Sequence, residues 1–257
     1  MGLFLVLECI LRFLVSVSSS SNGNIKDCFQ HLVWLLVVKE TKALKMRILI
    51  LLFLSGSLFA LDLQNLKTKF AEAGVFEAGD SLVDLKPGIH FLTERTKTQQ
   101  TLFIAIHGFQ TEGYEWVYPL VNINSTKNHI AFYRWKTNGC PNFATDNLHK
   151  IINEQKNNYP KIVLMGHSYG GIVVAQLLEK NYETPIEMHI IASGIAGERR
   201  LNNWCGYVAP KKTGSNVEAY QWMTIKELDG AFKNLKTDTQ IQNIEGVSPF
   251  RLPEEYK

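Results

Sequence analysis

Short apolar runs along this chain alternate with stretches in which apolar residues recur every three or four positions. Short runs bounded by turn residues are typical of buried strands, and the longer periodic stretches are typical of amphipathic helices. The pattern predicts strands at 89–95, 101–106, 130–135, 162–165, 186–192 and 217–224, and helices near 63–70, 113–120, 145–157 and 172–178. This alternation predicts an α/β domain with three layers, α/β/α, around a mostly parallel sheet whose strand ends carry the site.

The most informative stretch, residues 161–179, joins a strand pattern directly to a helix pattern. Its apolar run is followed by the sequence GHSYG at 166–170 and then by apolar residues at helical spacing. A serine at the tip of a sharp strand-to-helix turn has a strained backbone and an exposed hydroxyl, and glycines two residues to either side let strand and helix pack closely. Ser168 is therefore the candidate nucleophile. The alternative is a glycine-rich turn whose serine has no catalytic role.

With Gly166, Ser168 and Gly170 in a G-x-S-x-G pattern between a strand and a helix, the sequence resembles the α/β-hydrolase family of serine esterases, lipases and thioesterases. The resemblance implies an α/β-hydrolase fold and hydrolysis of carboxylic esters or acyl thioesters, a lipase-like or esterase-like activity of EC class 3.1. It also implies that the serine hydroxyl attacks an acyl carbon while backbone amides bind the oxyanion.

A second match to the family is the pair His107-Gly108, which directly follows a predicted strand. In the family, the loop at this place carries one oxyanion-hole amide, which here would come from Phe109 or Gln110. Tyr169, directly after the serine, would supply the other amide. Two interpretations of His107 remain open, a packing histidine or the general base.

The family's order of catalytic residues, serine then acid then histidine, places the acid after the strand at 217–224. Asp229 lies there, with Glu227 and Asp238 as alternatives. No histidine follows His189, which the pattern places inside a strand. The seven histidines are His31, His90, His107, His129, His149, His167 and His189.

Three interpretations of the missing base remain open. In the first, the sequence is cut before a final strand-helix unit that carries the histidine, so that the sheet would lack this unit. The protein would otherwise be a catalytically inactive binding or scaffold protein of the same fold. In the third interpretation, a distant histidine such as His107 acts as the base.

The first sixty residues differ in pattern from the rest. Residues 46–60, MRILILLFLSGSLFA, combine a positive residue, a short apolar run and small residues near the end, which is typical of a signal peptide. We expect Met46 to be the true start, residues 1–45 to be an upstream extension or a non-globular segment, and the hydrolase domain to cover 61–257. The protein would then be periplasmic or secreted. The alternative is a membrane anchor, although the apolar run is shorter than the roughly 20 residues that span a bilayer.

Composition and charge narrow the expected partners. After residue 60 the chain holds 21 basic and 21 acidic residues, so no basic field attracts nucleic acid. No motif indicates a metal or a cofactor, and we expect a small-molecule or lipid acyl substrate, with membrane contact only through an uncleaved N-terminal segment. The pairing of Cys140 with Cys205 and the oligomeric state are left open. Candidates for an apolar acyl pocket, or for ordinary core, are Phe109, Tyr114, Trp116, Tyr169 and Trp204.

Overall fold

The computed structural model describes residues 61–254, and the predicted upstream extension and signal peptide lie outside them. The helices of the described part are α4 (Leu63–Ala73), α5 (Val75–Val83), α6 (Tyr114–Asn122), α7 (Asn142–Gln155), α8 (Tyr169–Ala175) and α9 (Arg199–Cys205). Its strands are β1 (Gly88–Phe91), β2 (Thr101–Ile106), β3 (Asn128–Arg134), β4 (Lys161–His167), β5 (Ile186–Ile191), β6 (Val217–Met223) and β7 (Val247–Arg251). None of these helices has the length and apolar content needed to cross a lipid bilayer.

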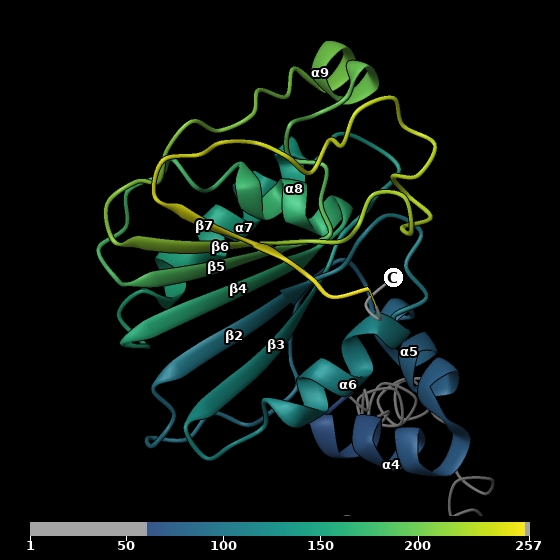
Figure 1. The fold of residues 1–257 in the computed structure, drawn as a ribbon. Coiled ribbons are helices and arrows are strands. Elements are labelled where there is room, and N and C mark those ends of the chain that lie inside the picture. Colours follow the sequence, from purple (N-terminus) through teal and green to yellow (C-terminus); the bar gives the residue numbers. More distant parts are fainter. Residues whose placement is uncertain (1–60, 255–257) are drawn as a thin grey trace, which may run out of the picture. The chain divides into compact units, whose positions relative to one another are not determined.

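The strands form one sheet in the order β1-β3-β2-β4-β5-β6-β7 (Figure 1). All neighbouring strands run parallel except β1 and β3, which are antiparallel. The middle strand of the seven is β4, which leads directly into Ser168. Because parallel strands need crossover connections, helices cover both faces of the sheet. The predicted three-layer α/β class with a mostly parallel sheet is therefore confirmed.

Two apolar layers flank the sheet. On one face, α7 and α8 pack through Leu148, Ile152 and Val173 against β2, β4 and β5. On the other face, α4, α5 and α6 pack against β2 and β3. Adjacent residues of β2 show the division, since Ile104 belongs to the first layer and Ala105 to the second. Successive side chains of a strand point to opposite faces, so a strand buried on both faces needs a continuous apolar run.

The edge strand β7 was not predicted from the sequence. Four of its five residues are exposed and Pro249 lies at its centre, so it has no apolar run. A proline has no N–H to donate to a neighbouring strand, and an edge strand tolerates that loss. β7 pairs in parallel with β6 and lies at the edge of the sheet. A strand is therefore present at the place where the sequence analysis expected the final strand to be missing.

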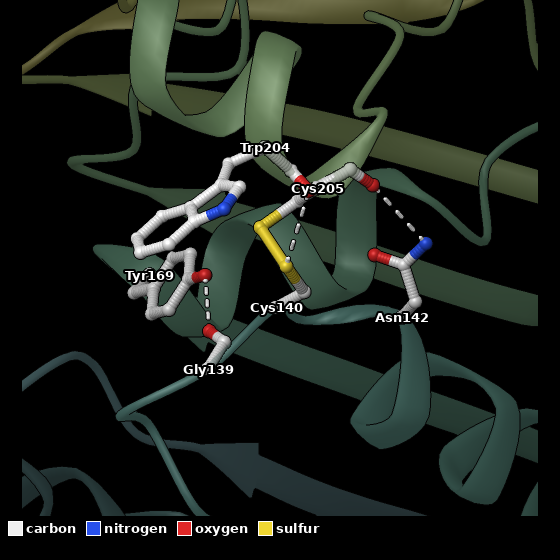
Figure 2. The surroundings of a disulfide bond; sticks show 6 residues. All are labelled: Gly139, Cys140, Asn142, Tyr169, Trp204 and Cys205. Carbon is white, nitrogen blue, oxygen red and sulfur yellow. Dashed lines mark hydrogen bonds between the residues drawn. A yellow bond between two sulfur atoms is a disulfide. The ribbon is translucent and has the colours of Figure 1, made fainter.

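A disulfide joins Cys140, just before α7, to Cys205, the last residue of α9 (Figure 2). The two Cα atoms lie 5.3 Å apart. The side chain of Asn142 also donates a hydrogen bond to the Cys205 carbonyl, at 3.5 Å. The pairing that the sequence left open is therefore made, and it ties α9 to the start of α7.

Candidate active site at the end of β4

The chain turns sharply at Ser168, between the end of β4 and the start of α8. Ser168 has φ 51° and ψ −118°, a combination that residues with a side chain rarely adopt. Such a conformation costs about 1–3 kcal/mol and persists only where the surroundings fix it. Here the Ser168 N–H donates to the Ile191 carbonyl (2.9 Å), and its carbonyl accepts from the Gly171 N–H (2.9 Å). The serine therefore lies at the tip of the turn, as predicted.

The two glycines of the G-x-S-x-G pattern are required by close backbone contacts. A Cβ atom on Gly166 would lie 2.5 Å from the Gly170 carbonyl oxygen, and one on Gly170 would lie 2.4 Å from the carbonyl oxygen of Ile106. Both distances are too short for any side chain, and the obstructing atoms belong to the backbone. Only glycine at these positions lets β2, β4 and α8 approach one another at the turn.

The loop after β2 lies directly against this turn. A Cβ atom on Gly108 would lie 3.0 Å from Ser168 Cβ and 3.5 Å from Ser168 Oγ. In the same loop Gln110 has a positive φ of 49°. The strand order of the sheet, together with a serine at the tip of the strand-to-helix turn after its middle strand, is the arrangement found in the α/β-hydrolase fold. The chain has an α/β-hydrolase fold.

Three backbone amides belong to the two segments that meet at the serine, the loop after β2 and the start of α8. Neither the Phe109 N–H nor the Gln110 N–H donates a hydrogen bond to any of residues 61–254. Tyr169 is the first residue of α8, so its N–H has no carbonyl partner within the helix. The sequence did not decide between Phe109 and Gln110, and both amides are without a partner in the described part of the chain.

The side chain of His107 holds the loop in place. Its Nδ1–H donates to the Gly108 carbonyl (2.8 Å), and Nε2 accepts from Arg134 Nη1 (3.0 Å) and from the Trp135 N–H (3.1 Å). The ring is fully buried, and this burial lowers the pKa of His107 to about 4. Both ring nitrogens of the neutral imidazole are therefore engaged. These contacts support the packing interpretation and leave no nitrogen of His107 to accept a proton from Ser168.

Asp229 lies in the connection after β6, at the carboxyl end of the sheet. Its Oδ2 accepts from the Thr224 hydroxyl (2.6 Å) and its Oδ1 accepts from the Ala231 N–H (2.8 Å). Of the two alternatives, Glu227 is exposed and Asp238 lies 3.4 Å from the Arg251 guanidinium. The Asp229 carboxylate thus has a fixed orientation, which a triad acid requires.

His167 was missed by the sequence analysis as a site residue. It directly precedes Ser168, and burial lowers its pKa, while the carboxylates of Glu115 and Asp229 raise it. Its Nδ1 is buried and has no hydrogen-bond partner in the described part of the chain. Glu115 lies in the first turn of α6, where it accepts a hydrogen bond from the Thr111 hydroxyl. The charges of Glu115 and Asp229, which come from segments far from His167 in the sequence, therefore act on a residue of the nucleophile turn, and no local spacing in the sequence indicates this.

The other histidines of the described part are engaged elsewhere. His90 contacts the Lys86 carbonyl, His129 contacts Tyr159 and Thr93, and His149 contacts Tyr182 and Asn153. The His189 ring bonds to Glu187 and Trp222, as expected for a residue inside a strand. Within residues 61–254, no hydrogen bond joins the Ser168 hydroxyl to a histidine.

The five aromatic candidates for an acyl pocket have different surroundings. Trp116 is buried in the layer that α4, α5 and α6 form, so it is ordinary core. Tyr169 is half-buried, with its ring 5.1 Å from that of Trp135 and its hydroxyl donating to the Gly139 carbonyl at 2.8 Å (Figure 2). Phe109, Tyr114 and Trp204 are exposed. An apolar wall beside Ser168 would therefore come from Phe109 and Tyr169, whose rings lie 6.4 Å apart.

Comparison with known proteins gives only remote likenesses. No protein-family model matches the chain, and no curated protein matches its sequence. Among solved structures, the chain is similar to LpqC, a poly(3-hydroxybutyrate) depolymerase from Bordetella parapertussis (9% identity, 64% of this chain, 76% of that chain, TM-score 0.44). It is also similar to Est816, described as an N-acyl homoserine lactone degrading enzyme (12% identity, 65% and 88%, TM-score 0.42), and to naproxen esterase from Bacillus subtilis (10% identity, 73% and 90%, TM-score 0.36). The assignment of the α/β-hydrolase fold rests on the strand order and the Ser168 turn.

Proposed function

We propose that this chain is a serine hydrolase that acts on carboxylic esters or acyl thioesters through Ser168. The observation that carries the proposal is the contact between the loop after β2 and the nucleophile turn, where a Cβ atom on Gly108 would lie 3.5 Å from Ser168 Oγ. The same loop carries the Phe109 and Gln110 amides, which have no partner among residues 61–254, and this supports an oxyanion hole beside Ser168. Acyl transfer needs this combination of a nucleophile and preorganised donors.

In the proposed reaction, Ser168 Oγ attacks the acyl carbonyl carbon, and the carbonyl oxygen becomes an oxyanion. The Tyr169 N–H and the N–H of Phe109 or Gln110 donate to this oxyanion, each contributing about 2.7–4 kcal/mol to the transition state. As the intermediate collapses to an acyl-enzyme, the bond from the acyl carbon to the leaving oxygen or sulfur breaks, and the proton taken from Ser168 by the base is transferred to that atom. Water then hydrolyses the acyl-enzyme and restores the serine hydroxyl.

Asp229 is the proposed triad acid. Two hydrogen bonds, from Thr224 and Ala231, fix its carboxylate at the end of β6. Its charge reaches the ring of His167, next to the nucleophile. A carboxylate in this place orients the histidine base and stabilises it when it takes the serine proton. The proposal leaves that histidine unassigned, because no histidine of residues 61–254 is bonded to Ser168.

The second candidate function is that of a catalytically inactive binding or scaffold protein of the same fold. The specific observation in its favour is that, in the described part of the chain, the Ser168 hydroxyl has no histidine partner. In a subtilisin-type site, removing the base lowers kcat by about six orders of magnitude. A chain without a base would bind acyl compounds and turn them over at a rate too low to measure.

The two candidates are distinguished with the full chain, p-nitrophenyl butyrate, an acyl thioester, and a fluorophosphonate probe whose adduct is located by mass spectrometry. We expect turnover, and labelling on Ser168, both lost in Ser168→Ala. The matched control is Ser193→Ala, which removes a buried serine hydroxyl outside the nucleophile turn and is expected to keep both signals. Turnover that survives in Ser168→Ala rejects the proposed mechanism, and a parent protein with neither turnover nor label favours the binding protein.

A further inference from the structure

Three apolar side chains that are close in sequence to the Cys140–Cys205 disulfide are exposed. Phe143, Trp204 and Val208 are 77%, 76% and 76% exposed, and each lies within three residues of one of the two cysteines. We call these three residues the disulfide patch. Apolar groups gathered on an exposed surface commonly mark an interaction site.

The backbone that carries the disulfide patch is held by the disulfide and by hydrogen bonds. The disulfide joins the two segments that carry it, and the side chain of Asn142 donates a hydrogen bond to the Cys205 carbonyl (Figure 2). Leu201 of α9 is buried, and the Tyr207 hydroxyl, just after the helix, donates to the Ile195 carbonyl at 2.7 Å. The backbone under the patch is therefore fixed while the apolar side chains above it remain in water.

Two arginines lie beside Trp204 of the disulfide patch. Arg199 and Arg200 are exposed on α9, and the Arg200 guanidinium lies 5.3 Å from the centre of the Trp204 ring. Neither arginine forms an ion pair with any of residues 61–254. Both line an open hollow of about 620 Å³ together with Glu198, Asn203 and Trp204. Lys211 and Lys212, which follow Val208, are also exposed.

We propose that the disulfide patch docks on an anionic lipid surface. Trp and Phe side chains partition into the boundary between headgroups and acyl chains, and Lys and Arg beside them attract anionic lipids. The two arginines of the hollow then bind headgroup phosphates through charge-assisted hydrogen bonds. The sequence analysis expected membrane contact only through the N-terminal segment, so this is a second and separate contact.

The docked orientation also places the candidate active site. The Tyr169 hydroxyl donates to the carbonyl of Gly139, the residue before Cys140, so the disulfide beside the patch is joined to the residue that follows Ser168. A chain bound through the patch holds the nucleophile turn close to the lipid surface. The docking proposal stands without the hydrolase proposal, because it rests on exposed side chains and charge alone.

Docking is tested by co-sedimentation of the full chain with two kinds of vesicle, one of phosphatidylcholine alone and one with about a third phosphatidylglycerol. All proteins carry Ser168→Ala, so that hydrolysis of lipid cannot affect the result. We expect Phe143→Ala with Trp204→Ala to lower the partition coefficient on anionic vesicles at least about tenfold. Arg199→Gln with Arg200→Gln is expected to lower it about thirtyfold on anionic vesicles and little on neutral ones.

The matched control is Phe76→Ala with Tyr118→Ala, which removes two aromatic side chains that are 59% and 64% exposed on α5 and α6. It is expected to bind within about twofold of the parent, and thermal melting establishes that each variant is folded. Equal binding by the patch variants and the control assigns membrane contact to another part of the chain and overturns the proposal. Absence of binding, or self-association that the patch variants abolish, also overturns it, and self-association identifies the patch as a contact between copies.

Discussion

Gly108→Ala tests the contact on which the proposed active site depends. A Cβ atom at this position would lie 3.0 Å from Ser168 Cβ, 3.2 Å from the His167 carbonyl oxygen and 3.5 Å from Ser168 Oγ. The first two distances are shorter than ordinary van der Waals contacts. The loop after β2 must therefore move away from the Ser168 turn by a few tenths of an ångström to accept the methyl group.

This displacement is expected to affect catalysis more than stability. Forcing one extra carbon into a packed site costs about 1–3 kcal/mol, which lowers Tm by about 2–12 °C in a domain of this size. The same movement lengthens the hydrogen bond from the Phe109 or Gln110 amide to the oxyanion. Loss of one such donor lowers kcat by about 10²–10³-fold. We therefore expect kcat of Gly108→Ala to fall by about 10²-fold, with little change in KM.

The assay compares ester hydrolysis, fluorophosphonate labelling and thermal melting for Gly108→Ala and Gly139→Ala. A Cβ atom on Gly139 would meet no atom within 4 Å, so this control makes the same chemical change in open space. It is expected to behave like the parent in all three measurements. If folded Gly108→Ala hydrolyses the ester as fast as the parent, the loop after β2 does not supply an oxyanion donor and the site assignment is wrong.

Three further predictions concern stability. Replacing both Cys140 and Cys205 by Ser is expected to lower the free energy of unfolding by about 2–4 kcal/mol, measured in urea, because the bond closes a long loop; a reductant should then have no effect on the variant. The buried Ser193 hydroxyl has no hydrogen-bond partner in the described part, so Ser193→Ala is expected to raise stability by about 1 kcal/mol, and a loss above 1 kcal/mol would contradict this. The pKa of His107 falls from 6.5 to about 4 on folding. As pH falls, the His107 ring therefore becomes protonated in the unfolded chain at a higher pH than in the folded chain. Stability should therefore decrease by about 3 kcal/mol as pH falls from 6.5 to 4, and His107→Gln should flatten this part of the urea-midpoint profile.

Most of the fold could be predicted because its strands are buried on both faces. In β2 and β4 both sets of side chains enter apolar layers, so the strands appear in the sequence as continuous apolar runs. The same rule explains why β7 was missed, since it is an exposed edge strand with Pro249 at its centre. The short helix α9 was missed because only Leu201 in it is buried, which leaves no apolar periodicity.

The local part of the site could also be predicted. The Ser168 turn is specified within five residues, because Gly166 and Gly170 are the positions where the backbone comes too close for a side chain. The electrostatic effect of Glu115 and Asp229 on His167 is not local, since the three residues belong to segments far apart in the sequence. A single sequence gives the residue types but not this juxtaposition.

The imidazole of His107 makes the loop after β2 sensitive to acid without taking part in any chemical step. A proton added to Nε2 would turn its lone pair into an N–H that faces two donors, the Arg134 guanidinium and the Trp135 amide. The ring would have to move away from these two donors, and the Phe109 and Gln110 amides of the same loop would lose their alignment. A decline of turnover at low pH would then result from displacement of the loop after β2. In enzyme kinetics such a decline is ordinarily assigned to protonation of the catalytic base.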